Sequence, residues 1–188
     1  MTVQFKETQP ENGLRLNEVP SELYGKWNRA LDDVLINKEG LTIIEIKKDS
    51  LGNTIDTLYD RYVLSESFRL YKAEEIYVLH VRYEKDPWAL FVMRFQKNGD
   101  INIYNFNNPD GFSKDKNLII EEAVFNVEGN DTIVKTLKPN FKAASELKKV
   151  IFSGQMDIAT LRKALKKNQL FLILKKDGTF YVPETKNK

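Results

Sequence analysis

The chain of 188 residues contains no cysteine and one histidine, His80. The lack of thiols excludes disulfide bonds, cysteine nucleophiles and cysteine-ligated zinc. A single imidazole excludes a histidine-rich metal site, and a Ser-His-acid catalytic set would have to be built on His80 alone. Because His80 lies among apolar residues of a strand-like run, we interpret it as a hydrogen-bonded structural residue. We therefore expect a protein that is not an enzyme and that carries no cofactor or metal.

A surplus of charge of one sign is also lacking, since 29 Lys and Arg face 27 Asp and Glu. Phosphate binding needs clustered cations, so no nucleic-acid partner is expected. Lysines at 142–149 and 163–167 would suit an acidic partner or lipid headgroups, although solvated helix faces are the favoured interpretation. No phosphate-binding glycine loop or dinucleotide fingerprint occurs.

Long apolar runs are absent as well, so we expect a soluble chain with no integral membrane segment. Residues 1–19 do not have the design of a signal peptide. They are polar and rich in turn-forming residues, which predicts a flexible tail or tether. Such a start fits a cytoplasmic protein, or a protein of the cell envelope or periplasm whose export signal was removed.

The composition, with 41% hydrophobic and 30% charged residues, is that of an ordinary globular protein. The length favours one domain, over residues 20–188, with residues 137–188 forming an α+β extension packed on it.

Three glycine-containing turns, at 37–40, 98–99 and 177–178, are flanked by apolar or β-branched residues and predict three hairpins. The runs 57–64 and 76–84 also predict strands. Turn signals at short intervals favour a mainly β fold of the up-and-down type.

The strand at 76–84 and the run at 87–95 predict a further hairpin with Lys85-Asp86 as a two-residue turn. This register places Tyr83 opposite Trp88, Val81 opposite Leu90 and Leu79 opposite Val92. Both faces of the hairpin are then largely apolar, so each must be covered, by the opposite wall of a barrel or by helices.

Two arginines, Arg82 and Arg94, lie within these otherwise apolar strands. An arginine that faces a low-dielectric interior needs an anionic partner, which is either a ligand or a carboxylate such as Glu45, Asp60 or Glu84. The structural ion pair is the favoured interpretation. The predicted ligand-binding residues are Tyr77, Leu79, Val81, Arg82, Leu90 and Arg94.

Helices are predicted only near the C-terminus. Residues 140–151 have helical spacing, although 150–152 fit a strand equally well. Asp157 is a candidate cap for a helix with apolar residues at Ile158, Leu161, Ala164 and Leu165, and a strand at 170–174 follows. In the loop 105–115, Asn107, Asn108, Asp110 and Asp115 would suit an all-oxygen calcium site, but a solvated turn is favoured.

Residues 20–27, Pro-Ser-Glu-Leu-Tyr-Gly-Lys-Trp, place a short turn before a Gly-x-Trp step at the start of a strand. This motif resembles the first characteristic region of the lipocalins, and the later order of strands, a helix at 157–167 and a strand at 170–174 is similar. The chain looks most like the divergent lipocalin-like domains of bacterial envelope proteins.

The resemblance implies an antiparallel up-and-down barrel that binds a small hydrophobic ligand, with Gly25 and Trp27 at its closed end. The alternative is a protein–protein interaction or inhibitor module that uses the outer face of the 76–95 hairpin.

Overall fold

The structure is a computed structural model that describes residues 2–28, 32–64, 67–82, 87–106, 108–109, 112, 117–127, 130–137, 147–168 and 170–182. Strands dominate these residues, and the fold is mainly β, as predicted. The strands divide into a four-stranded sheet and an eleven-stranded sheet. Among the described residues, no helix has the length and apolar character needed to cross a bilayer.

The four-stranded sheet is an antiparallel meander of β3 (Gly25–Asn28), β4 (Asp32–Asn37), β5 (Gly40–Lys48) and β6 (Thr54–Val63). A short 3-10 helix, η1 (Ser21–Leu23), precedes it, so the predicted turn before the Gly-x-Trp strand is confirmed. The turn between β4 and β5 is held by Asn37, whose Oδ1 accepts from the backbone N–H groups of Glu39 and Gly40. A side chain at Gly40 would place its Cβ 2.1 Å from the carbonyl oxygen of Tyr62, so only glycine fits.

The large sheet contains a second antiparallel meander of β7 (Phe68–Ala73), β8 (Ile76–Val81), β9 (Trp88–Phe95) and β10 (Ile101–Asn105). Next to β10 lie β14 (Leu170–Leu174) and β15 (Phe180–Tyr181), and β2 (Leu14–Arg15) pairs with β7. Tight turns with positive φ at Gly99 and Gly178 connect β9 to β10 and β14 to β15. All three predicted glycine hairpins are therefore confirmed.

The register predicted for the 76–95 hairpin is wrong by one residue. Leu79 lies opposite Phe91, and Val81 lies opposite Ala89. An odd number of residues separates the partners of each pair, which a two-residue turn cannot produce. Because side chains alternate between faces, the shift moves Leu90 away from the face that carries Leu79.

The N-terminus differs from the expected tether. β1 (Thr2–Phe5) runs parallel to β13 (Leu147–Ser153) and antiparallel to β9. Val3 and Phe5 are buried. The alternation of apolar and polar side chains over these few residues is a strand signal that the polar residues after them obscure.

The remaining strands form one end of the large sheet. β11 (Ile119–Val127) lies between β12 (Asn130–Leu137) and β13, and both neighbours are antiparallel to it. The predicted helix at 140–151 is wrong over 147–151, and the alternative strand at 150–152 is correct and forms part of β13; residues 140–146 lie outside the described residues. The predicted second helix is confirmed as α1 (Ile158–Leu165), where the Asp157 side chain accepts from the N–H of Thr160 at 2.6 Å.

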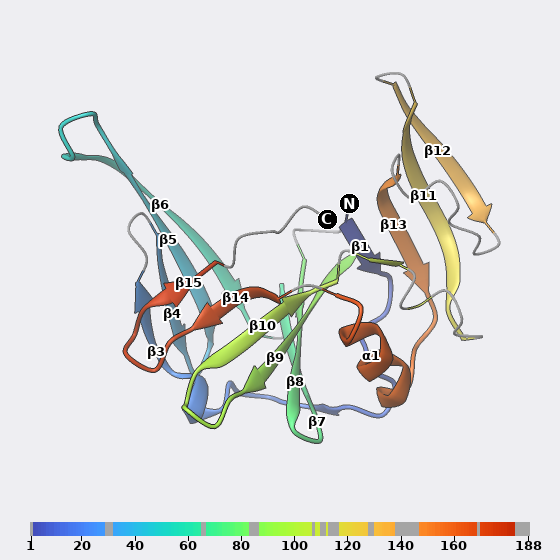
Figure 1. The fold of residues 1–188 in the computed structure, drawn as a ribbon, viewed down its shortest axis with the longest axis horizontal. Coiled ribbons are helices and arrows are strands. Elements are labelled where there is room, and N and C mark those ends of the chain that lie inside the picture. The colour runs from blue at the N-terminus through green and yellow to red at the C-terminus, as the bar shows by residue number, and fades with distance from the viewer. Residues whose placement is uncertain are drawn as a thin grey trace.

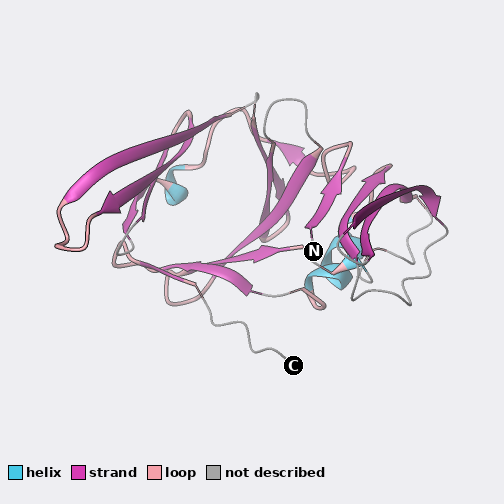
Figure 2. Ribbon diagram, turned by 90° about the horizontal axis from the view of Figure 1, so that it is seen from above, coloured by secondary structure: helices cyan, strands magenta, loops and turns pink. Residues whose placement is uncertain are grey.

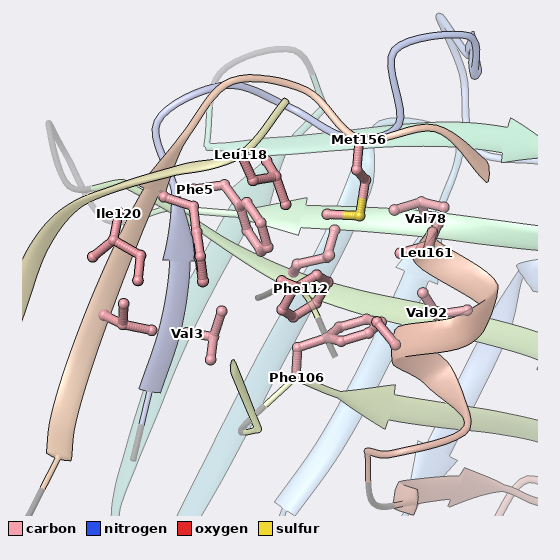
Figure 3. Close-up of a cluster of buried hydrophobic side chains, with 14 of the residues drawn as sticks. Val3, Phe5, Val78, Val92, Phe106, Phe112, Leu118, Ile120, Met156 and Leu161 are labelled. Carbon is pink, nitrogen blue, oxygen red and sulfur yellow. The ribbon is translucent and has the colours of Figure 1, made fainter. Parts of the chain in front are cut away.

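Two hydrophobic cores cover the two faces of the β8–β9 hairpin. The first core lies between this hairpin, α1 and the β11–β13 strands (Figure 3). Its central side chains are Val3, Phe5, Val78, Val92, Phe106, Phe112, Leu118, Ile120, Met156 and Leu161. The second core lies between the other face and the β3–β6 sheet, and it includes Trp27, Leu70, Tyr77, Leu79 and Met93. The expectation that both faces must be covered is thus confirmed.

Among the described residues, isolated backbone bridges join the two sheets at two places. Leu64, just after β6, bridges to Phe68 at the start of β7, and Asn28 of β3 bridges to Thr179 beside β15. The N–H of Asn28 also donates to the carbonyl of Gly178 at 2.7 Å. Figure 1 shows the β3–β6 sheet on the left and β11–β13 with β1 on the right, while Figure 2 shows the same arrangement from above.

Candidate functional site

A cavity of about 330 Å³ lies between the β3–β6 sheet and the strands β8, β9, β10 and β14. Its volume falls at the lower end of the range typical of small-molecule sites, roughly 300–1,000 Å³. Strand alternation creates its walls, because every second residue of each strand points inward. The inward residues include Val34 and Ile36 of β4, Leu41 and Ile43 of β5, Leu79 and Val81 of β8, and Ala89, Phe91 and Met93 of β9.

The polar side chains of the cavity wall are few and unevenly placed. Among the described lining residues they are those of Gln4, Tyr62 and Arg82. Gln4 of β1 lies directly opposite Ala89, which in turn lies opposite Val81, the neighbour of Arg82. Gln4 and Arg82 therefore belong to the same end of the cavity. The Oε1 atom of Gln4 is buried and has no hydrogen-bond partner, and its Nε2 lies 3.5 Å from the carbonyl oxygen of Pro87.

Arg82 lies beside a buried tryptophan and a second arginine. The guanidinium carbons of Arg82 and Arg69 lie 4.3 and 4.5 Å, respectively, from the ring centroid of Trp88. Burial, together with the positive charges of Arg15 and Arg82, lowers the pKa of Arg69 from its usual value. The Nε atom of Arg69 is buried without a hydrogen-bond partner.

Neither Arg82 nor Arg94, the two arginines for which a structural ion pair was favoured, forms an ion pair with a carboxylate among the described residues. Within the described ranges, no ion pair joins Arg69 or Arg82 to a carboxylate. Glu45 and Asp60 lie on β5 and β6, while Glu84 lies outside the described residues. The favoured structural ion pair is therefore not found in the part of the chain that the structure describes.

The six predicted ligand-binding residues fall in different places. Leu79, Val81 and Arg82 line the cavity. Leu90 belongs to the first core, on the opposite face of the hairpin, and Arg94 is exposed opposite Ile76.

Tyr77 belongs to the second core but does not line the cavity. Its hydroxyl donates to Glu22 at 2.6 Å, and burial with this hydrogen bond raises the pKa of Tyr77 to about 12.

Most of the lining residues were not predicted from the sequence, and Gln4, Ala89, Phe91 and Met93 are among them. The one-residue register error concealed the three residues of β9, because it assigned them to the opposite face from Leu79. Gln4 was missed because the polar, turn-forming residues of the segment 1–19 predict a tail.

Gly25 and Trp27 pack against each other rather than on the cavity. Trp27 is 7% exposed and belongs to the second core. Gly25 has a φ of +155°, and a Cβ there would lie 3.2 Å from the Cη2 atom of the indole. The glycine therefore allows the indole to lie close to the backbone of its own strand.

His80 anchors the segment that leads from β1 to β2. It is fully buried, and its Nε2 lies 2.6 Å from the carbonyl oxygen and 3.1 Å from the backbone nitrogen of Gln9. Beside it, the hydroxyl groups of Tyr71 and Thr8 are 2.8 Å apart. Burial lowers the pKa of His80 to about 4, against the opposing effect of the Gln9 hydrogen bond, so the ring is neutral at physiological pH.

This shift predicts that acid weakens the fold through His80. Between about pH 6.5 and pH 4 the unfolded chain protonates this imidazole and the native protein does not, so stability is lost as the pH falls. The contribution amounts to at most about 3 kcal/mol. We expect the stability difference between the wild type and His80→Gln, measured by urea unfolding, to shrink by up to this amount across that interval. A difference that is independent of pH would contradict a buried neutral histidine.

The candidate cation loop lies largely outside the described residues, which exclude Asn107, Asp110 and Asp115. The backbone N–H of Asn108 donates to Oδ1 of Asn168 at 2.9 Å. Elsewhere in the described part of the chain, no cluster of three or more His, Asp or Glu side chains is arranged to hold a metal ion.

The arrangement is suited to burying an apolar group, with the side chain of Gln4 at one end of the cavity. No family model matches this chain, and comparison with curated proteins and with solved structures finds no significant match.

Proposed function

We propose that the protein is a non-enzymatic binding protein that holds a small hydrophobic or amphipathic ligand between its two sheets. The observation that carries the proposal is the cavity of about 330 Å³, whose walls are aliphatic and aromatic except at one end. Binding of an apolar ligand to such a surface is favourable, because each Å² of apolar area removed from water stabilises the complex by about 25 cal/mol.

We further propose that the strands around the cavity form a lipocalin-like up-and-down barrel. Two features support this. The strands β3 to β10 follow each other as antiparallel neighbours within each sheet, and the two sheets meet at the Leu64–Phe68 and Asn28–Thr179 bridges. Such an arrangement would enclose a cavity with few free strand edges.

The interaction module is the weaker alternative. It was expected to use the outer face of the 76–95 hairpin, but within the described residues one face of this hairpin lies under the first core and the other under the second. The apolar side chains that suggested a docking surface are therefore engaged in the packing of the protein itself.

Binding of an uncharged fluorescent probe tests the carrier function. We expect N-phenylnaphthylamine to bind the wild-type protein with a micromolar Kd and enhanced fluorescence. Ala89→Trp fills the cavity from the end that carries Gln4 and should weaken binding by at least about tenfold, which corresponds to 1.4 kcal/mol. Leu35→Trp is the matched control, because Leu35 points to the outer side of β4 and is 38% exposed.

Unfolding curves of both variants establish that they are folded. If Ala89→Trp does not fold, Val81→Phe narrows the same region with a smaller change in volume. Failure of the wild type to bind the probe would contradict the carrier function. Equal loss of binding in Leu35→Trp would show that the probe does not report on the cavity.

A further inference from the structure

The face of the β8–β9 hairpin that lies away from the cavity carries a group of arginines. Trp88 directly precedes Ala89, which lines the cavity, so strand alternation directs the indole to the opposite face. Trp88 also lies opposite Phe5, a member of the first core, and is 3% exposed. The guanidinium carbons of Arg69 and Arg82 lie 4.5 and 4.3 Å from the centroid of this ring. Arg82 borders the cavity as well, but its guanidinium belongs to the Trp88 face.

The pairing of β2, β7 and β8 brings three arginines to this face. Arg15 of β2 lies opposite Tyr71 of β7, and Arg69 points to the same side as Tyr71, two residues earlier in that strand. Arg69 in turn lies opposite His80 of β8, and Arg82 follows two residues after His80. Arg15 is exposed, while Arg69 and Arg82 are half-buried. The group is therefore accessible to a ligand from the side of Arg15.

The described part of the chain does not neutralise this group. None of the ion pairs among the described residues includes Arg15, Arg69 or Arg82. Burial, together with the positive charges of Arg15 and Arg82, lowers the pKa of Arg69, and its buried Nε atom has no hydrogen-bond partner. Stacking on Trp88 stabilises a cation through the face of the ring, but it leaves the in-plane N–H groups able to donate. A bound anion would relieve the repulsion and accept hydrogen bonds from these groups.

We propose that this face binds a phosphate group, free or carried by a small phosphomonoester, between Arg69 and Arg82 beside the indole of Trp88. A phosphate group carries a charge of about −1.5 to −2 at neutral pH and several acceptor oxygens, so it can accept from both guanidinium groups. A carboxylate would neutralise only one of them. Arg15 would add positive potential from the exposed side, and the Tyr71 hydroxyl, which interacts with Arg69, is a further donor nearby. The site is separate from the cavity, so the inference is independent of the carrier function.

The fluorescence of Trp88 tests this site. The chain contains two tryptophans, so Trp27→Phe leaves Trp88 as the only indole. We expect inorganic phosphate, titrated at neutral pH and constant ionic strength, to change this fluorescence saturably with a Kd below about 1 mM. Isothermal titration calorimetry of the wild type should give the same Kd. Sulfate should compete with phosphate, whereas acetate and chloride should bind at least about tenfold more weakly.

Arginine variants show which side chains hold the anion. Arg69→Met and Arg82→Met should each weaken phosphate binding by at least about tenfold, and the corresponding lysine variants should weaken it less, because they retain the charge but lose the planar fork. The matched control is Arg94→Met, which removes an exposed arginine near the other end of β9 and should leave phosphate binding unchanged. Urea unfolding establishes that each variant is folded. If the half-buried positions do not tolerate methionine, Arg15→Met replaces an exposed side chain and should still weaken binding a few-fold.

The outcomes decide the inference and identify the source of the phosphate group. Tighter binding of glycerol phosphate than of inorganic phosphate supports a phosphomonoester as the ligand, and the reverse supports the free ion. Absence of saturable phosphate binding by the wild type overturns the inference, as does equally tight binding of acetate. Binding that is as strong in the Arg69, Arg82 and Arg15 variants as in Arg94→Met also overturns it. Arg69→Met should bind N-phenylnaphthylamine like the wild type, because the cavity lies on the other face of the hairpin.

Discussion

Phe5→Ala is expected to lower the free energy of unfolding by about 3–5 kcal/mol, which is the usual cost of emptying a large buried aromatic site. Phe5 is 0% exposed. Its ring packs edge-on against Phe112 at a centroid distance of 5.3 Å and stacks on Phe152 at 5.6 Å. Because β1 joins β13 to β9, loss of this side chain weakens the contact between the two ends of the large sheet. Urea unfolding followed by far-UV circular dichroism measures the change.

Tyr59→Ala is the control for this prediction, because Tyr59 is an aromatic residue of β6 that is 67% exposed. It should change stability by no more than about 0.5 kcal/mol. A comparably small effect of Phe5→Ala would return residues 1–5 to the tail that their sequence context suggested, and would remove Gln4 from the cavity wall.

Trp27→Ala is expected to cost a similar amount, about 3–5 kcal/mol, through the second core. The indole is 7% exposed and lies over Gly25, between the β3–β6 sheet and the β8–β9 hairpin. Removal of the indole leaves an empty volume beside β3 at the edge of the four-stranded sheet, and the meander that forms one side of the cavity loses a packing contact. Thermal and urea unfolding, compared with the wild type, measure this cost.

The neighbouring Tyr24, which is 40% exposed, provides the matched aromatic control, and Tyr24→Ala should have a small effect. Because Trp27 does not line the cavity, the folded fraction of Trp27→Ala should still bind N-phenylnaphthylamine under conditions that favour the native state. A cost of less than about 0.5 kcal/mol would place Trp27 at the surface and remove the physical basis of the Gly-x-Trp resemblance.

Turns and helices that depend on a few neighbouring residues could be predicted from the sequence. The glycine turns at 37–40, 98–99 and 177–178 could be predicted because a tight hairpin needs backbone conformations that few residues adopt. The helix after Asp157 could be predicted because a cap and a helical apolar stripe occur together within a few residues. Part of the cavity wall, Leu79 and Val81, followed from simple alternation along one strand.

The wrong predictions concern structure that depends on the pairing of two segments distant in the chain. The register of β8 and β9 depends on the length of their connection, and a shift of one residue transferred Leu90 to the first core and brought Phe91 into the cavity. The segment at 147–153 has apolar positions that fit a helix or a buried strand. It is a strand because β11 and β1 flank it and bind its backbone.

From the amino-acid sequence one could predict a mainly β chain with tight hairpins, one capped helix and two apolar faces on the 76–95 hairpin, because these features follow from backbone preference and side-chain period. The packing of distant segments was needed to establish that residues 2–5 form a strand and that Gln4 of this strand lines the cavity. It also decided that Arg69 and Arg82 share Trp88. The physical reason is that strand pairing is non-local: backbone hydrogen bonds and buried area join segments that are far apart in the chain, and no local pattern specifies the partner.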